Sequence, residues 1–282
     1  MAVVAWKGSG RVHRADRTDR DISGVPMKVV VCVKQVPDPN STGQLDASSH
    51  LLKRDGELVL DPGDEFGVEA GLQLAEKHGG EVTVISMGPE RGMDAVRKAL
   101  AMGAARGVLI SDDSLRGSDA LSTAKVLAAA IGKQEFDVVI TATESTDGYT
   151  GVVPQMLAGL LDIPAITFAK SVSFDGDTLK VERQTETGID VVEAKLPVVL
   201  SVTAGVNEPR YPSLKGIMGA KQKPMDRPTP ADLGVEGVGG ASARQKITAV
   251  QAAPERAAGE IIQDDGEAAK RIVDFLSDKK VI

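Results

Sequence analysis

The sequence predicts an α/β protein in which helices cover both faces of a parallel sheet. From Met27 onward, short runs of apolar β-branched residues alternate with segments whose apolar residues recur at helical spacing. The connections between these segments are short, which indicates successive strands joined by right-handed helical crossovers. Aromatic residues make up only 3% of the 282 residues, so Val, Ile, Leu and Ala must build the core, as they do in buried parallel sheets.

Apolar runs and helical periodicities alternate in a regular order along the first two thirds of the chain. The predicted buried strands are residues 28–36, 81–87, 107–111, 136–141 and 196–202. A polar loop at 37–54 separates the first strand from the first helix. The helices between the strands are marked by Val68, Leu72 and Ala75 before a stop at Gly79-Gly80, by Met93, Val96 and Leu100 before Gly103, by Leu121, Ala124, Ala128 and Ile131 after a cap at Ser118 or Asp119, and by residues 152–161.

The pattern changes beyond residue 170. Residues 171–180 carry the turn signal Asp175-Gly176-Asp177 between alternating segments, which predicts a hairpin, and a more polar excursion around Gly188 covers 181–195. After Asn207 the chain is rich in Pro, Gly and Lys, and then in Gly, Ala and Val up to residue 253. Only the last stretch regains helical spacing, through Ala268, Ile272, Phe275 and Leu276. A floppy tail is one interpretation; an arm that lies on another polypeptide is the other.

Composition excludes several classes of function. The net charge of -7 argues against general binding to a phosphate backbone, which needs clustered Lys and Arg. The single cysteine, Cys32, excludes an internal disulfide and a thiolate metal cage and fits a reducing compartment. No apolar run approaches the roughly 20 residues that span a bilayer. Residues 1–26 mix basic and acidic residues without an apolar block, so we interpret them as a disordered extension, with Met27 as the working initiator.

No catalytic or metal-binding set emerges from the sequence. The three histidines, His13, His50 and His78, lack ligand spacing, and no nucleophile can be paired with a base and an orienting group. Cys32 lies in an apolar strand, where a buried inert thiol is expected. These absences point to binding or electron transfer, and neither a catalytic residue nor a metal site is predicted.

The carboxyl ends of the predicted strands are the expected ligand site, because neighbouring loops diverge there in open parallel sheets. Small and hydroxyl-bearing residues gather in the loop 142–153, which joins a strand to a helix. Its glycines, Gly148 and Gly151, would let backbone N–H groups approach an anion such as a nucleotide phosphate. There is no P-loop ending and no GxGxxG, so a plain Ser/Thr/Gly turn that caps a helix is the alternative.

A second candidate site lies in the segment 207–224, NEPRYPSLKGIMGAKQKP. Leu214, Ile217 and Met218 fall on one side of a short helical turn, flanked by Lys215, Lys221 and Lys223. An apolar knob with a basic rim predicts a docking site for an acidic partner. The alternative is a surface loop with one buried anchor residue and no binding function.

Several stretches together resemble the electron transfer flavoprotein β subunit over residues 27–282. They are KVVVCVKQVPD at 28–38, VRKALAMGAARGV at 96–108, ESTDG at 144–148, VERQTETGIDVVEAKLPVVLSV at 181–202 and NEPRYPSLKGIM at 207–218. The resemblance implies a Rossmann-like parallel sheet of the adenine-nucleotide-binding type with a β-hairpin excursion. It also implies three regions: the extension 1–26, an α/β domain at 27–224 that includes the docking loop 207–223, and an arm with a helix at 225–282 that packs on a larger α subunit.

The family's cofactors and partners follow from the same resemblance. It implies a cytoplasmic heterodimer with one FAD, held mainly by the α subunit, and a structural AMP in the β subunit. It implies electrons received from flavin dehydrogenases of the acyl-CoA dehydrogenase type, as in fatty acid oxidation, and passed to a membrane quinone oxidoreductase. The docking loop falls on 207–223, anchored by Leu214. The nucleotide contacts fall on Cys32, Asp61, Pro62, Gly63, Asp64, Met87, Ala142, Thr143, Glu144, Ser145, Thr146, Asp147, Gly148, Tyr149, Thr150, Gly151, Val152 and Val153.

This chain departs from some relatives at three places. Asp61 and Gly63 replace an Asn and an aromatic residue, the loop 142–153 lacks an acidic run after its glycine, and Pro39 stands where some relatives place a tyrosine near the flavin. Two alternatives stay open at this stage. One is a flavin-bifurcating relative with a second FAD that oxidises NADH, and the other is a free-standing nucleotide-binding protein of the universal-stress type.

Overall fold

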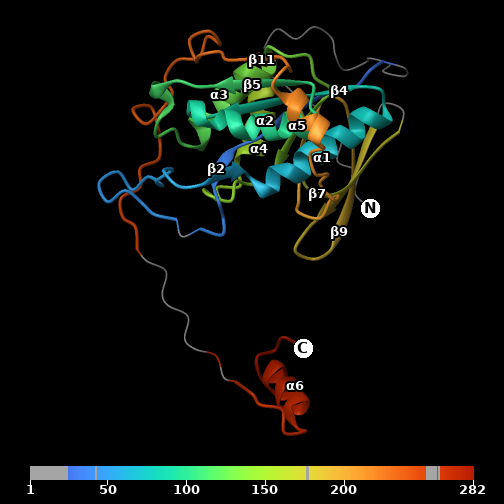
Figure 1. Ribbon diagram of the computed structural model, residues 1–282. Coiled ribbons are helices and arrows are strands. Elements are labelled where there is room, and N and C mark those ends of the chain that lie inside the picture. Colours follow the sequence, from blue (N-terminus) through green and yellow to red (C-terminus); the bar gives the residue numbers. More distant parts are fainter. Residues whose placement is uncertain (1–24, 42, 176–177, 252–258, 260) are drawn as a thin grey trace. The chain divides into compact units, whose positions relative to one another are not determined.

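The computed structural model describes residues 25–41, 43–175, 178–251, 259 and 261–282 (Figure 1). The chain forms two compact units, one that ends at Lys246 and one that runs from Ile247 to Ile282. The extension expected at 1–26 lies outside the described residues, except for Val25 and Pro26.

A mixed, mostly parallel sheet forms the centre of the first unit. Within the described residues it has nine strands in the order β11-β5-β4-β1-β6-β10-β7-β8-β9. Neighbours from β11 to β7 pair in parallel, and β8 and β9 continue the sheet as antiparallel strands. The strands are β1 (Lys28–Cys32), β4 (Glu81–Met87), β5 (Arg106–Ile110), β6 (Val138–Ala142), β7 (Ala165–Asp175), β8 (Thr178–Gln184), β9 (Ile189–Lys195), β10 (Val198–Val202) and β11 (Met225–Asp226).

Helices cover both faces of the parallel part of the sheet, as predicted. On β1, Val29 and Val31 belong to the apolar cluster that contains the helices α1 and α2. Val30 and Cys32 belong to the cluster on the opposite face, with α3 and α4. The helices are α1 (Pro62–Lys77), α2 (Met93–Met102), α3 (Ala120–Gly132), α4 (Val153–Leu161) and α5 (Leu214–Ala220), with 3-10 turns at Glu90–Gly92 and Asp113–Leu115.

Helix α1 packs unusually close to β1. A Cβ added at Gly71 would lie 2.9 Å from Cγ2 of Val31 and 3.3 Å from Cγ1 of Val29. Only a glycine allows this approach, because any side chain would displace the buried valines. The helix thereby holds its amino-terminal end against the carboxyl edge of the sheet.

The strand predicted at 28–36 is wrong in its extent. β1 ends at Cys32, and a separate strand, β2 (Gln35–Pro37), pairs antiparallel with β3 (Leu58–Leu60) in a second sheet. The chain leaves the central sheet because the N–H of Lys34 donates to the carboxylate of Asp64 and not to a neighbouring strand. The continuous run of apolar residues in 28–36 therefore gave no sign that the chain changes direction between β1 and β2.

The hairpin predicted at 171–180 is present, but it is part of a larger antiparallel extension. β7 begins at Ala165, and Asp175 pairs with Thr178 across the turn; Gly176 and Asp177 lie outside the described residues. The polar excursion expected at 181–195 is instead the end of β8 and the whole of β9. Val181, Val192 and Ala194 face the apolar cluster, whereas Glu182, Gln184, Glu193 and Lys195 are exposed on the other face, which is the alternation of a half-covered strand.

The first unit continues beyond residue 224, where we expected the arm to begin. β11 pairs in parallel with β5. Leu233, Val235 and Val238 pack against the apolar cluster that contains α3. Near its end, the N–H of Arg244 donates to Oδ2 of Asp119 at 2.7 Å. Residues 225–246 thus complete the α/β unit.

The second unit contains one helix, α6 (Ala268–Asp278), among its described residues. Ala268 is buried, whereas Ile272, Val273 and Phe275 are about half exposed. The described helices include none that is both long enough and apolar enough to span a membrane.

Candidate functional site

The carboxyl ends of β1, β4 and β6 meet the first turn of α1 at one edge of the sheet. Cys32 is the last residue of β1, Met87 of β4 and Ala142 of β6. The parallel registers of these strands place all three ends at the same edge. This is the arrangement that the sequence predicts for the ligand site.

Asp61 connects the segments that converge there. The residue is fully buried, and its Oδ1 accepts the N–H of Gly63 at 2.9 Å as the N-cap of α1. Its Oδ2 accepts the N–H of Thr146 at 2.8 Å and the hydroxyl of Thr146 at 3.2 Å. Its own N–H donates to the carbonyl of Lys34 at 2.9 Å. Asp61 therefore fixes the segment after β1, the start of α1 and the loop 142–153 relative to one another.

A second buried carboxylate, Asp64, lies in the same corner. It accepts the N–H of Lys34 at 2.7 Å and a backbone hydrogen bond from Ala142. Burial, followed by the nearby charge of Asp61, raises the pKa of Asp64 well above its ordinary value of 3.8. Burial and the charge of Asp64 raise the pKa of Cys32 to about 12, so this thiol stays protonated and inert.

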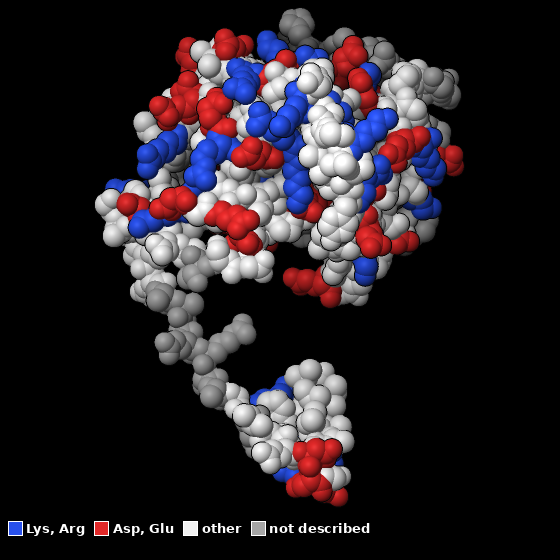
Figure 2. Space-filling model, in the orientation of Figure 1, with Lys and Arg blue, Asp and Glu red and all other residues white. Residues whose placement is uncertain are grey.

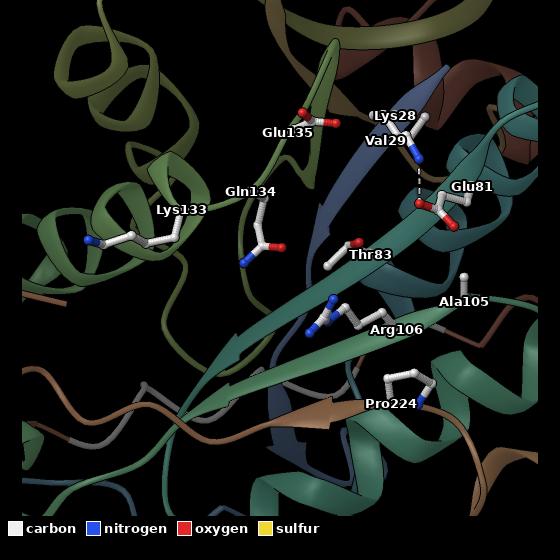
Figure 3. Close-up of a pocket in the computed structure, with 10 residues that line it drawn as sticks. All are labelled: Lys28, Val29, Glu81, Thr83, Ala105, Arg106, Lys133, Gln134, Glu135 and Pro224. Carbon is white, nitrogen blue, oxygen red and sulfur yellow. Dashed lines mark hydrogen bonds and ion pairs between the residues drawn. The ribbon is translucent and has the colours of Figure 1, made fainter. Parts of the chain in front are cut away.

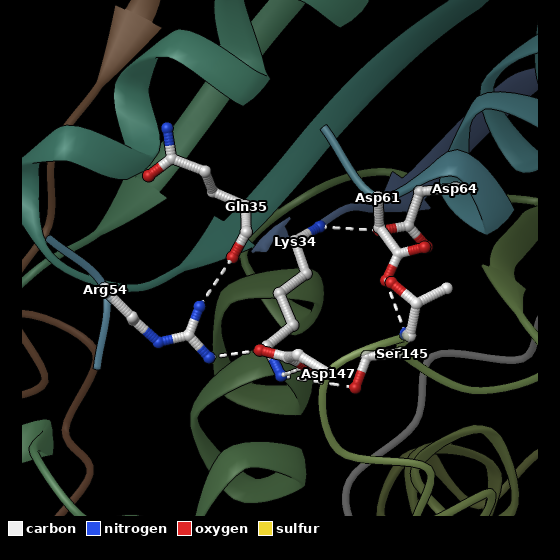
Figure 4. A network of polar contacts seen from close by, with 8 residues as sticks. Lys34, Gln35, Arg54, Asp61, Asp64, Ser145 and Asp147 are labelled. Carbon is white, nitrogen blue, oxygen red and sulfur yellow. Dashed lines mark hydrogen bonds and ion pairs between the residues drawn. The ribbon is translucent and has the colours of Figure 1, made fainter. Parts of the chain in front are cut away.

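Asp147 holds two cations beside the loop (Figure 4). Its Oδ1 accepts from Nζ of Lys34 at 2.5 Å, and its Oδ2 pairs with Arg54. Nζ of Lys34 also reaches the hydroxyl of Ser145 at 3.2 Å. Burial acts to raise the pKa of Asp147, but the charges and hydrogen bonds of Lys34 and Arg54 outweigh it and lower that pKa. The loop 142–153 is thereby attached to both the segment that follows β1 and the long loop 38–57.

The loop 142–153 has the features of an anion-binding turn. Among the described residues, no side chain caps the amino terminus of α4, whose N-cap is Val152. Gly151 has a φ of 62°, in the region that favours glycine. A Cβ added at Gly63 would approach the Cβ of Ala142 and Oδ1 of Asp61 to 3.3 Å, which leaves a narrow backbone cradle between the two segments. These residues fit a nucleotide phosphate.

The predicted contact residues divide into a fixed part and an open part. Asp61, Gly63, Asp64, Thr146 and Asp147 are held together by the bonds described above. Tyr149, Thr150 and Val152 are exposed on the outer turn of the loop. The structure brings the segments nominated for the nucleotide together at one edge of the sheet.

Sequence reasoning missed two participants, Lys34 and Arg54. Lys34 lies two residues beyond Cys32, so its place at the carboxyl end of the first strand was a usable signal. Arg54 follows a long polar loop, and nothing in its sequence surroundings indicates a partner more than ninety positions away. Only the folded structure assigns it to this site.

The second candidate site is an exposed apolar patch on α5, which we call the docking patch and define as Leu214, Ile217 and Met218. The exposed fractions of these residues are 73%, 51% and 62%. Figure 2 shows a white area over α5 with Lys and Arg side chains beside it. The short helix was predicted correctly. Tyr211, 96% exposed, was not singled out from the sequence and lies just before it.

A polar pocket of about 350 Å³ opens at the opposite, amino-terminal edge of the sheet (Figure 3). An ion pair of 2.5 Å between Lys28 and Glu81 crosses its lining. Basic and acidic groups alternate around it, so the pocket offers no consistent charge to a ligand. It lies apart from the carboxyl-edge corner and from the docking patch. Its lining residues are Lys28, Val29, Glu81, Thr83, Ala105, Arg106, Lys133, Gln134, Glu135 and Pro224.

The described residues contain no cluster of three or more His, Cys, Asp or Glu side chains arranged for a metal ion. The sheet, its helices and the polar corner at its carboxyl edge are those of a Rossmann-like α/β protein.

Comparison with known proteins gives the family. Residues 50–233 match the model of the electron transfer flavoprotein domain. The electron transfer flavoprotein subunit beta of Mycobacterium tuberculosis is 43% identical over 263 residues, which cover 90% of this chain and 99% of that protein. The corresponding subunits of Thermoanaerobacterium thermosaccharolyticum, at 38% identity, and of Megasphaera elsdenii, at 33%, cover 91% and 90% of this chain and 100% and 98% of their own lengths.

The chain therefore belongs to the electron transfer flavoprotein β-subunit family. Membership implies an α-subunit partner and association with a flavin in the heterodimer. Proteins of this family are electron carriers and not catalytic enzymes.

Proposed function

We propose that this chain is the nucleotide-holding and partner-docking subunit of a heterodimeric electron carrier. The heterodimer receives electrons from flavin dehydrogenases of the acyl-CoA dehydrogenase type and passes them to a quinone oxidoreductase at the membrane. Its FAD is held mainly by the α subunit and supplies the redox chemistry, while this chain supplies position and charge. The single cysteine is consistent with the reducing cytoplasm in which we place it.

The carboxyl-edge network is the observation that carries the proposal. Asp61 and Asp147 assemble the segments that the family resemblance assigns to a structural AMP. In that role the backbone N–H groups of Val153 and Gln155, at the start of α4 where no described side chain provides a cap, would hold the phosphate, and residues 61–64 and Met87 would enclose the remainder. A pre-formed corner of this kind suits a nucleotide that stays bound as part of the structure.

The docking patch supports the second half of the proposal. Its apolar side chains stand in solvent on a short helix, beside Lys215 and Lys221. Isolated exposed apolar residues are ordinary, but several together with a basic rim suit an acidic partner surface. We assign this patch to the dehydrogenase. The second unit, with its half-exposed apolar residues on α6, is assigned to the α subunit.

The nucleotide content of the purified heterodimer tests the first assignment. Denaturation followed by mass spectrometry should release one FAD and one AMP per heterodimer. Two FAD per heterodimer and no AMP would replace the proposal with the bifurcating alternative. A chain purified from its native cells without a partner or a nucleotide would contradict it altogether.

Truncation of the main apolar side chain tests the docking assignment. Leu214→Ala should leave assembly and flavin content intact and slow reduction by the dehydrogenase roughly 10- to 100-fold at low dehydrogenase concentration, as expected when a central anchor of an interface is lost. Leu160→Ala, which shortens a half-exposed leucine on α4, is the control. Equal reduction rates in the two variants, measured by stopped-flow absorbance of the flavin, would overturn the assignment.

A further inference from the structure

Arg210 makes the most extensive contact between α1 and the segment that carries the docking patch. Nε of Arg210 donates to Oε2 of Glu69 at 2.7 Å, and its Nη2 donates to Oε1 of the same carboxylate at 3.0 Å. Nη1 and Nη2 also reach the carboxylate of Glu76, at 2.5 and 3.0 Å. The backbone N–H of Arg210 adds a bond of 3.2 Å to Glu69. The guanidinium thus engages two carboxylates that lie seven residues apart on the same face of α1.

Glu69 is the buried member of this group. Only 3% of the residue is exposed, and Nε2 of Gln73 donates to its Oε1 at 2.9 Å. Burial acts to raise the pKa of Glu69, but the hydrogen bonds from Arg210 and Gln73 outweigh it and lower that pKa. A buried carboxylate that depends on one arginine loses its main partner if the arginine leaves. Arg210 is therefore tightly held in place.

Three further contacts hold the segment at other points. Nδ2 of Asn207 donates to the carbonyl of Phe66 at 3.0 Å on α1. Nζ of Lys223 donates to the carbonyls of Leu100 and Ala104 at 2.8 and 2.7 Å, at the end of α2. A Cβ added at Gly216 would lie 2.4 Å from the carbonyl oxygen of Ala101, so α5 rests directly on α2. The apolar side chains of the docking patch point away from these contacts into solvent.

We propose that Glu69 and Arg210 are positioning residues for partner docking: they fix the orientation of α5, so that the docking patch meets a dehydrogenase without first having to be ordered. An interface segment that is already rigid avoids the entropy loss of ordering on binding. The inference rests on the proposed docking function and adds to it the residues that hold the docking patch in the orientation that binds the dehydrogenase. Neither residue belongs to the patch itself.

The test uses the complete heterodimer with Glu69→Gln and Arg210→Lys. Glu69→Gln keeps the shape of the side chain and removes its charge, and Arg210→Lys keeps the charge and removes the fork. Glu81→Gln, which removes the same charge from an exposed ion pair at the other edge of the sheet, is the matched control. Each heterodimer is reduced by an acyl-CoA dehydrogenase from the same organism, and hydrogen exchange of 207–223 is followed by mass spectrometry.

We expect Glu69→Gln to raise the KM for the heterodimer roughly 2- to 30-fold, the range for substitutions that act through packed neighbours. The kcat, the FAD content and the AMP content should stay within about twofold of wild type, and exchange in 207–223 should accelerate. Arg210→Lys should give a smaller change of the same kind. A merely structural defect would instead lower flavin content and kcat together.

Two outcomes overturn the inference, and they can be told apart from failure of the docking proposal. If Leu214→Ala weakens reduction but Glu69→Gln leaves both KM and exchange at wild-type values, the positioning role is wrong and docking stands. If Leu214→Ala has no effect, the docking assignment itself fails. Rapid exchange of 207–223 in the wild type would also refute a pre-ordered segment.

Discussion

At the scale of single residues, Asp64 is the group whose ionisation the fold opposes most clearly. Its carboxylate is buried beside Asp61, and two backbone N–H groups only partly offset that environment. Its pKa is higher in the folded chain than in the unfolded chain. The folded state therefore holds this proton more tightly, and stability falls as pH rises above about 3.8 through the raised folded value.

Asp64→Asn should remove this contribution. The amide cannot ionise, and its oxygen can still accept from the N–H of Lys34. The variant should melt at a higher temperature than wild type at pH 8, and the difference should shrink as pH approaches 4. Thermal melts by circular dichroism across that range measure it. Asp94→Asn, at an exposed position of α2, removes the same charge and should give a curve parallel to wild type; a parallel curve for Asp64→Asn would refute the argument.

The pH dependence of stability that His78 contributes has the opposite direction to that of Asp64. Burial, followed by the charge of Lys77, lowers its pKa below 6.5, and its Nε2 is buried without a hydrogen-bond partner among the described residues. The ring packs edge-on against Phe174. The unfolded chain takes up the proton first as pH falls below about 6.5, so stability should decline from there to the lower folded value. His78→Phe should make the denaturant concentration at the unfolding midpoint depend less on pH between pH 7 and 5. The same pH dependence as in the wild type would contradict this.

At the scale of elements, the contact between α1 and β1 is the most sensitive to volume. Gly71→Ala places a methyl group against Val31 at a distance that no Cβ normally adopts. The substitution should lower the free energy of unfolding by about 1–3 kcal/mol, as overpacking of a closed core does. Urea unfolding of the purified heterodimer measures this change.

The control for that prediction is another helical glycine. Gly159 on α4 has no atom within 4 Å of an added Cβ. Gly159→Ala should therefore stabilise the chain by about 0.5–1 kcal/mol through helix propensity alone. A destabilisation of equal size in the two variants would show that close packing at Gly71 is not the cause.

At the scale of the whole molecule, the boundary between the two units predicts different results for two truncations. A chain that ends at Lys246 keeps β11 and the apolar contacts of Leu233, Val235 and Val238. It should unfold at nearly the temperature of the full chain but bind the α subunit more weakly. A chain that ends at Pro224 loses those contacts and should aggregate or melt several degrees lower. Equal melting of both would show that residues 225–246 add nothing to the core.

The regular alternation of strands and helices was predictable from the sequence. The elements whose position depends on contacts with residues far away in the sequence were not. Strand β4 was placed to the residue and the end of helix α2 was correctly placed before Gly103, because apolar periodicity and glycine stops are local signals. The division of 28–36 into two strands escaped prediction, since it depends on a carboxylate thirty positions away. β11 has two residues and no apolar pattern of its own.

The candidate site divides in the same way. Asp61, Asp64 and the loop 142–153 were nominated because parallel strands bring their carboxyl ends together. Lys34 and Arg54 were not, because pairing with Asp147 depends on the path of a long loop. The docking patch was predicted from the sequence as a short apolar helix. The ion pairs of Arg210 that hold it were not, because their partners lie 141 and 134 positions away in the sequence.

Helix α1 contributes both to the candidate nucleotide site and to the support of the docking patch. Its first turn belongs to the corner capped by Asp61, and its later turns present Glu69 and Glu76 to Arg210. With 16 residues it is about 24 Å long, a single stiff rod. A tilt of that rod at the corner would also shift the docking patch, which Arg210 attaches to the later turns of α1. Evolution of one end is therefore constrained by the other, and sequence changes along α1 are expected to come in compensating pairs.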